Sequence, residues 1–145
     1  MWTDERGSEV LGPPECRRLL AVGAKEHLHG HLAVADGSVP FVLPLDYSVH
    51  DSDIIVQIGE GLFSGVVERL VAFQVDGRIG HQGLQGVEDV CEWSVLVQGL
   101  ATEVDAGSLG SHEPHPRVAD PGHRLVRIRS DVLTGRRLHP AGHWT

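Results

Sequence analysis

Two adjacent side chains in the middle of the chain, Asp46 and Tyr47, combine a carboxyl group with a phenol. A carboxyl group inside an apolar pocket has a raised pKa and can hydrogen-bond a ligand ring or act as a general acid or base. The phenol could donate a hydrogen bond to a ligand carbonyl. The alternation of residues 41–49 supports another reading, in which Asp46 faces solvent and Tyr47 shares a core face with Leu43 and Leu45. On the first of these two readings, Asp46 and Tyr47 are the candidate catalytic residues.

Histidines are the second group of side chains that could do chemistry. His29 and His31 share one face of an expected strand and could hold a metal ion. No third ligand follows from the spacing, so the favoured reading is that the chain has no metal site. The segment 112–115 differs from the helical H-E-x-x-H zinc motif, because Pro114 is incompatible with a helix interior.

Aromatic and basic side chains in the second half of the chain could contact a ligand. Trp93 could stack on a planar ring, or it could be a core or interface aromatic. Arg136 and Arg137 could grip an anion, or they could form a solvated basic stripe. The glycine-rich segment 80–86 lacks the strand-then-helix setting of a nucleotide loop, so we expect a flexible flap over a pocket.

The elements that must position these groups follow from hydrophobic spacing. Two prolines open a helix that we expect to run from Pro13 to about His27, with apolar residues on one face. Period-2 alternation predicts strands at 29–35, 41–49, 54–58, 70–76, 93–101 and 124–132, the last continued by 135–138. Short helices are expected at 62–69 and within 103–112, and loops at 77–90 and 111–122. Pro44 should lie at an edge, at a bulge or at a point where the strand ladder is broken.

Length and composition restrict the class of protein. The 145 residues, 41% of them hydrophobic, suit a single domain over 1–145, with a loose arm at 1–11 and a polar tail at 139–145. No apolar run approaches the roughly 18 residues of a membrane span. The two cysteines form no disulfide framework and point to free thiols in the cytoplasm. A net charge of −8 argues against a nucleic-acid partner and an anionic membrane surface.

Strands joined by hairpins and closed by a late strand predict a barrel of roughly six strands, since closure removes exposed edges. Five blocks occur in the order found in the pyridoxamine 5′-phosphate oxidase-like proteins, the FMN-binding split barrels. The blocks are Glu15–Leu20, Gly30–Pro40, Leu43–Tyr47, Val71–Asp76 and Trp93–Ala101. Residues 135–138 resemble the closing motif of that family. The resemblance implies a mainly β (α+β) fold, a six-stranded antiparallel split β-barrel with an N-terminal helix and short peripheral helices.

The resemblance also implies a homodimer with FMN pockets between the subunits. The residues that it places at the cofactor are Leu43, Pro44, Leu45, Gln57, Gly61, Leu62, Phe63, Ser64, Trp93, Arg136 and Arg137. The chain departs from the family at the phosphate clamp, where Gln57 and Gly59 stand for a basic and hydroxyl pair and Phe63 stands for a lysine. Asp46 takes the place of an asparagine beside the flavin. A phosphate dianion needs charge-assisted donors, so these departures weaken FMN binding unless an arginine elsewhere compensates.

The function that the resemblance implies is an FMN-dependent oxidoreductase acting on a small organic molecule in a pocket at the dimer interface. The cofactor would carry the hydride and the protein would supply orientation and electrostatics. The alternative is a repurposed barrel that has lost FMN and binds or converts an apolar small molecule by acid/base chemistry. Haem is a third, disfavoured cofactor. The sequence does not identify the substrate, and whether the chain is an enzyme stays open.

Overall fold

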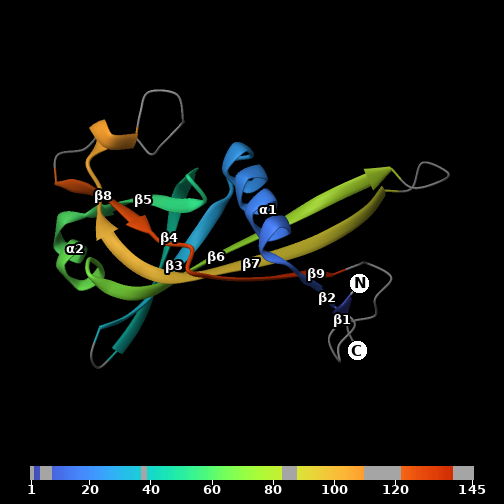
Figure 1. Ribbon diagram of the computed structural model, residues 1–145, viewed down its shortest axis with the longest axis horizontal. Helices are drawn as coiled ribbons and strands as arrows, with labels where there is room; N and C mark the ends of the chain where they lie inside the picture. The colour runs from blue at the N-terminus through green and yellow to red at the C-terminus, as the bar shows by residue number, and fades with distance from the viewer. Residues whose placement is uncertain (1, 4–7, 37–38, 83–87, 110–121, 139–145) are drawn as a thin grey trace.

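The computed structural model describes residues 2–3, 8–36, 39–82, 88–109 and 122–138 (Figure 1). The elements in chain order are β1 (Trp2–Thr3), β2 (Glu9–Leu11), α1 (Pro13–Lys25), β3 (His29–Asp36), β4 (Val39–His50), β5 (Asp53–Gly59), α2 (Glu60–Val66), β6 (Arg69–Gln82), β7 (Glu88–Glu103), the 3₁₀ helix η1 (Ala106–Leu109), β8 (His123–Ile128) and β9 (Val132–Leu138). Within these ranges no helix is long and apolar enough to cross a membrane.

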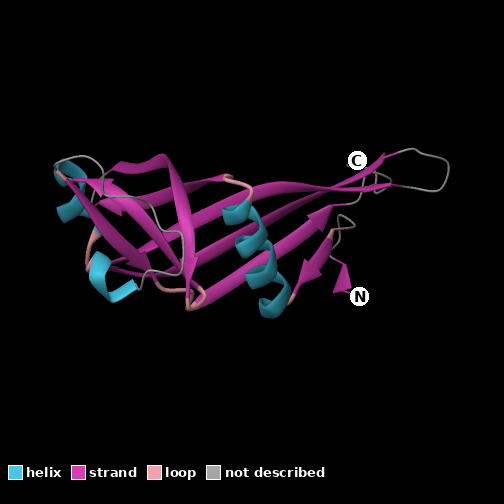
Figure 2. Ribbon diagram, turned by 90° about the horizontal axis from the view of Figure 1, so that it is seen from above, coloured by secondary structure: helices cyan, strands magenta, loops and turns pink. Residues whose placement is uncertain are grey.

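The strands form one antiparallel sheet that closes on itself at one end. Its order is β1-β2-β9-β7-β6-β3-β4-β5-β8, and a further pairing of β7 with β8 joins the ends of a six-stranded ring. Strands β9, β2 and β1 continue the sheet outside the ring. The long β6–β7 ribbon joins the barrel to the strands outside it, because one end of the ribbon belongs to the barrel and the other extends away from it (Figures 1 and 2). The predicted six-stranded antiparallel barrel is confirmed.

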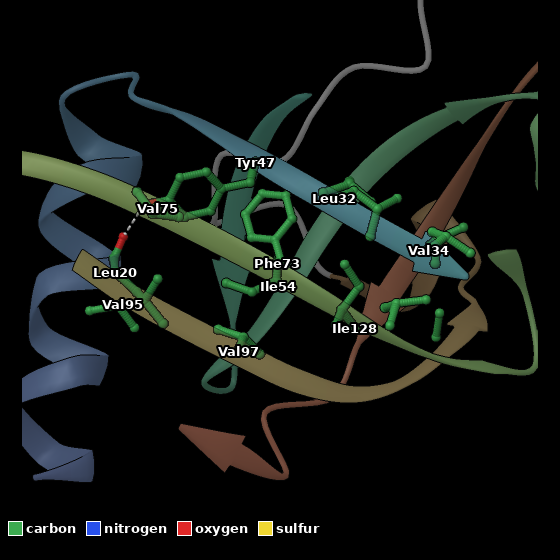
Figure 3. Packing of buried hydrophobic residues seen from close by; sticks show 14 of the residues in the cluster. Leu20, Leu32, Val34, Tyr47, Ile54, Phe73, Val75, Val95, Val97 and Ile128 are labelled. Carbon is green, nitrogen blue, oxygen red and sulfur yellow. Dashed lines mark hydrogen bonds between the residues drawn. The ribbon is translucent and has the colours of Figure 1, made fainter. Parts of the chain in front are cut away.

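The core lies inside the ring and follows from the alternation of the strands. Val71, Phe73 and Val75 of β6 are buried, whereas the residues between them face outward. Phe73 is fully buried, and its ring meets the edge of Tyr47 with centroids 5.4 Å apart (Figure 3). This edge-to-face geometry is favourable for aromatic pairs. Val95 of β7 adds to the same inner face.

Helix α1 covers one opening of this core, as Figure 1 shows. Its prolines stand in the first turn, where a missing N–H costs nothing. The predicted apolar face is confirmed, because Cys16, Leu19, Leu20 and Gly23 are all buried. The helix ends at Lys25, close to the expected end.

The ring closes where the chain after β8 passes over β7 at Gly99. A Cβ atom at Gly99 would lie 1.8 Å from the carbonyl oxygen of Arg129. The N–H of Arg129 donates to the carbonyl of Leu100 at 3.0 Å. The crossing therefore requires a residue without a side chain at this position.

The structure corrects two expectations about irregular segments. The predicted loop at 77–90 is wrong over most of its length, since β6 extends to Gln82 and β7 begins at Glu88. Gly77 belongs to a strand because the ring of Trp93 fills the space beside it, with Cζ2 2.3 Å from where a Cβ would stand. The arm at 1–11 includes β2, which pairs with β9 and buries Leu11.

The last strand, expected at 124–132 and continued by 135–138, is wrong as a single strand, because the chain crosses β7 at Arg129 and so separates β8 from β9.

Other expectations differ in extent or are untested. The short helix expected at 62–69 is α2, and the one expected within 103–112 is η1. Pro44 pairs with β3 on one side, and β4 pairs with β5 only from Tyr47 onward, so the expectation that Pro44 lies at an edge or interruption of the ladder is confirmed. The flap tip at 83–87, most of the loop at 111–122, the 112–115 segment and the tail lie outside the described residues.

An ion cluster ties α1 to the strands outside the barrel. The carboxylate of Glu15 accepts hydrogen bonds from Arg18 and Arg137, and Arg137 also donates to Glu9 of β2 at 3.3 Å. The hydrogen bond from Arg18 lowers the pKa of Glu15 most, and the hydrogen bond from Arg137 and the charges of both arginines lower it further, to about 2 from 4.5, although burial acts in the opposite direction. The cluster is therefore strongest when Glu15 is ionised.

We expect Gly99→Ala to lower the free energy of unfolding by about 1–3 kcal/mol, because a backbone carbonyl must move to admit the methyl group. Urea unfolding followed by circular dichroism measures the loss. Gly61→Ala is the matched control, since nothing lies within 4 Å of a Cβ at that helical position and alanine favours helix. A Gly99→Ala protein as stable as wild type would contradict the close crossing.

The stability of the protein should depend on the ionisation of Glu15. Because its folded pKa is depressed, the stabilisation is complete above the ordinary value of 4.5 and is lost as pH falls toward about 2. We expect Glu15→Gln to destabilise the protein most near neutral pH and to approach wild type in acid. Unfolding curves at a series of pH values measure the difference. Glu26→Gln, at an exposed position at the end of α1, should show a smaller pH-dependent difference.

Candidate functional site

An apolar cleft of about 480 Å³ lies on the outer face of the sheet, opposite the core. Its lining comes from β3, β4, β6, β7 and the start of β9 and comprises Ala33, Val34, Ala35, Pro40, Phe41, Val42, Leu70, Val71, Ala72, Gln98, Gly99, Asp131 and Val132. Cross-strand register places Val42, Ala33, Ala72, Gln98 and Val132 side by side across five strands. The volume lies within the roughly 300–1,000 Å³ range of small-molecule sites.

The cleft is bordered by large apolar side chains that water reaches. Leu70 is 78% exposed, Val42 61% and Val132 49%, whereas the alanines between them are small and form the floor. A contiguous exposed apolar patch on a soluble domain marks a binding surface. The shape suits a flat apolar ligand lying across the strands.

Polar side chains continue the same outer face beyond the cleft. His29 and Asp46 are register partners, with Nδ1 and Oδ1 2.7 Å apart, and both side chains are mostly exposed. Gln74 donates from Nε2 to Asp76 at 3.2 Å and to Ser94 at 3.0 Å. Asp46 therefore faces solvent in the single chain, as the second reading of this residue expected.

The phenol of Tyr47 lies on the opposite face and belongs to the core. It is buried and donates a hydrogen bond of 2.7 Å to the carbonyl of Leu20 in α1 (Figure 3). Burial, and secondarily the charge of Glu26, raises the pKa of Tyr47. The hydroxyl group thus links a strand to the helix.

The other residues predicted to contact the cofactor lie on different faces and elements of the structure. Pro44 and Arg136 lie on the outer face with Asp46, whereas Leu43, Leu45 and Trp93 lie on the inner side. Arg137 belongs to the ion cluster at α1. The structure therefore does not gather the predicted set into one site.

The remaining predicted residues lie at the barrel end that carries α2. Gln57 is half-buried, Gly61, Leu62 and Ser64 are exposed, and Phe63 is buried. This placement separates them from Trp93 and from the ion cluster.

Sequence reasoning missed the charged group at this barrel end. The guanidinium of Arg124 lies 3.8 Å from the centre of the Phe63 ring. It donates to Glu60 at 3.3 Å and to Glu103 at 2.5 Å. Hydrogen bonding to Glu103, together with the charges of both carboxylates, raises the pKa of Arg124. Arg124 is 64 positions from Glu60 and 21 positions from Glu103 in the chain. No local sequence pattern therefore reveals this group.

Two other chemical expectations concern cysteines and metals. Cys16 and Cys91 are both buried and neither forms a disulfide, as expected of thiols outside a disulfide framework. Burial raises the pKa of both thiols. In the part of the chain that the structure describes, no three His, Cys, Asp or Glu side chains gather to hold a metal ion.

Comparison with known families places this fold. A family model described as pyridoxamine 5′-phosphate oxidase matches residues 13–137. The chain belongs to this family. None of the curated protein sequences compared with the chain matches it.

Solved structures share the fold of this family member at low sequence identity. The FAD binding protein from Mycobacterium smegmatis has a TM-score of 0.65 and 22% identity, covering 90% of this chain and 99% of its own. An FAD-binding protein from Mesorhizobium loti has a TM-score of 0.59 and 23% identity, covering 90% and 97%. The FAD and heme binding protein from Mycobacterium smegmatis has a TM-score of 0.59 and 11% identity, covering 90% and 73%.

The residues of this family member fit the planar ring of a flavin better than the phosphate of its tail. The apolar cleft fits a planar ring, because its floor is made of alanines and its borders of larger aliphatic side chains. The end at α2 does not fit a phosphate, because Glu60 and Glu103 place two carboxylates around the one guanidinium of Arg124.

We expect Tyr47→Phe to lower the free energy of unfolding by about 1–2 kcal/mol, because the buried carbonyl of Leu20 loses its donor. Thermal or urea unfolding measures the effect, and ligand binding should be unchanged. A variant of wild-type stability that has lost activity would instead support the catalytic reading of Tyr47.

Proposed function

We propose that the protein binds a flavin-type ring in the outer-face cleft and acts as a flavin-dependent oxidoreductase on a small organic substrate. Membership of the pyridoxamine 5′-phosphate oxidase family supports the proposal, as do the FAD-binding structural neighbours. The observation that carries it is the cleft of about 480 Å³, which is apolar, built on rigid strands and open to a flat ligand.

The proposed site is completed by a second copy of the chain. Small-molecule sites bury about 70–90% of a ligand, whereas Leu70 and Val42 stand mostly exposed in the single chain. A second copy laid on this face would cover the ligand and bury these side chains. The homodimer is therefore part of the same proposal.

The residues of the chain have separate roles in this proposal. The alanines and valines hold and orient the ring, and a bound flavin supplies hydride transfer. Asp46 engages Nδ1 of His29, so Nε2 is the nitrogen through which His29 would exchange a proton with a ligand. Gln74 offers a hydrogen-bonding amide on the same face.

A second candidate function rests on the charged group at α2. Glu60 and Glu103 surround Arg124 where the family resemblance expects a phosphate clamp. This arrangement favours a repurposed barrel that binds or converts an apolar molecule by acid/base chemistry. Asp46 and His29 would be the acid/base pair.

The absorption spectrum distinguishes these functions. The protein is purified, incubated with riboflavin, FMN or FAD, and passed through a desalting column. We expect flavin absorbance to remain with the protein for at least one of them. Loss of all flavin absorbance would contradict the first function and favour the second, and a Soret band would indicate haem.

We expect Leu70→Glu to abolish both dimerisation and flavin retention, because a charge at this exposed position cannot be buried without a partner. Sedimentation and the desalting assay measure the two effects. Val10→Glu is the matched control, since Val10 is an exposed apolar residue on β2, outside the cleft. Equal behaviour of the two variants would contradict the placement of the site.

A further inference from the structure

A mostly polar row of side chains borders the apolar cleft on the same outer face of the sheet. Cross-strand register places side by side, across four strands, His31, Gln74, Leu96 and Thr134. Gln74 follows the cleft residue Ala72 by two positions on β6. The two side chains therefore point to the same face, about 7 Å apart along the strand. A ligand that lies in the cleft has this row at one of its ends.

Two hydrogen bonds hold the amide group of Gln74. Its Nε2 donates to the carboxylate of Asp76 at 3.2 Å and to Oγ of Ser94 at 3.0 Å. Asp76 and Ser94 are themselves register partners on β6 and β7. An ionised carboxylate only accepts hydrogen bonds, so the nitrogen of the amide, and not the oxygen, has to face Asp76. The surroundings thus hold the amide in one orientation.

This orientation determines what Gln74 can offer to a ligand. An amide nitrogen carries two hydrogen atoms, and Asp76 and Ser94 accept both of them. The remaining polar atom of Gln74 is Oε1, which accepts hydrogen bonds and is turned away from both partners. The neighbouring His31 is exposed, as Gln74 is, and an imidazole can donate through an N–H group. The border of the cleft therefore presents an acceptor with a donor beside it.

Gln74 also stands between two depressions of the outer face. Ala72 lines the apolar cleft, whereas Asp76 lines a smaller hollow of about 310 Å³. This hollow is polar, because an ion pair of 3.2 Å between Arg78 and Glu92 borders it as well. The face thus changes from apolar to polar at Gln74. A planar ligand matches such a face when one of its ends is apolar and the other carries polar atoms.

We propose that Gln74 determines ligand specificity, because its Oε1 accepts a hydrogen bond from an N–H group at the polar end of a flavin-type ring. A flavin ring carries two methyl groups at one end and an N–H group between two carbonyl groups at the other. The methyl end lies over the alanines of the cleft and the N–H end meets Gln74. The inference rests on the proposed function, which supplies the ring. It goes further by giving the ring a direction and by naming the ligand atom that the site selects.

The matched probes are riboflavin and riboflavin methylated at this ring nitrogen, since they differ only in whether the nitrogen carries a hydrogen atom or a methyl group. Binding of each is measured by quenching of flavin fluorescence in one buffer. Wild type should bind riboflavin about fivefold or more tightly than the methylated form, because the methylated ring leaves Oε1 of Gln74 without a donor. The variant Gln74→Ala should bind the two flavins with nearly equal affinities.

Gln98→Ala is the matched control, since Gln98 is another exposed glutamine on this face and lies within the cleft. It should change both affinities alike and keep their ratio at the wild-type value. Asp76→Ala should lower the ratio, because the amide of Gln74 can then turn its nitrogen toward the ligand. All three positions are exposed, so the variants should fold, and circular dichroism checks that they do.

Equal affinities of wild type for the two flavins would overturn the inference and leave the proposed function intact. A ratio that is unchanged in Gln74→Ala, or that is lost to the same extent in Gln98→Ala, would contradict the role of Gln74. An unchanged ratio in Asp76→Ala would contradict the fixed orientation of the amide on which that role depends. If wild type binds neither flavin, the inference and the proposed function both fail.

Discussion

The close crossing of the chain over Gly99 closes the barrel, and the rest of the structure depends on it. Only three residue pairs join β7 to β8, and directly after them the backbone of Arg129 occupies the space that a side chain at position 99 would take. The crossing holds β8 against β7, and β8 in turn pairs with β5 along its length. The positions of β5, α2 and Arg124 therefore follow from a contact between two backbone segments.

Closure also gives the sheet an inner face, which forms the core, and an outer face, which carries the cleft. Inside, Phe73 and its neighbours form a core capped by α1. Outside, the residues of β3, β4 and β6 that line the cleft are small or apolar, whereas a solvated sheet face would be polar there. A strand that is apolar on both faces is expected where both faces are buried in the functional assembly. The apolar outer face thus accounts both for the cleft and for the proposal that a second copy covers it.

The two ends of the outer face differ in polarity. His29 and Asp46 stand at one end of β3 and β4, whereas Leu70 and Val42 border the cleft toward the other. Arg124 and its two carboxylate partners lie instead at the barrel end that carries α2, on the side of the buried residue Val126. A flat ligand in the proposed site would therefore meet hydrogen-bonding groups at one end of the outer face and aliphatic side chains at the other.

The sequence by itself determined the helix α1, the family and the barrel strands, except that it joined β8 and β9 into one, because alternation, paired prolines and block order are local patterns. It also offered the core face of β4 as one of two readings of Tyr47, since Leu43 and Leu45 share its periodicity, and the structure decided for the core. Only the tertiary structure extended the β6–β7 hairpin through the glycines, where Trp93 fills the space beside Gly77. It alone brought Arg124 between Glu60 and Glu103. Such contacts depend on which strands close the ring. Pairing between segments distant in sequence produces no periodic pattern of residues from which it could be predicted.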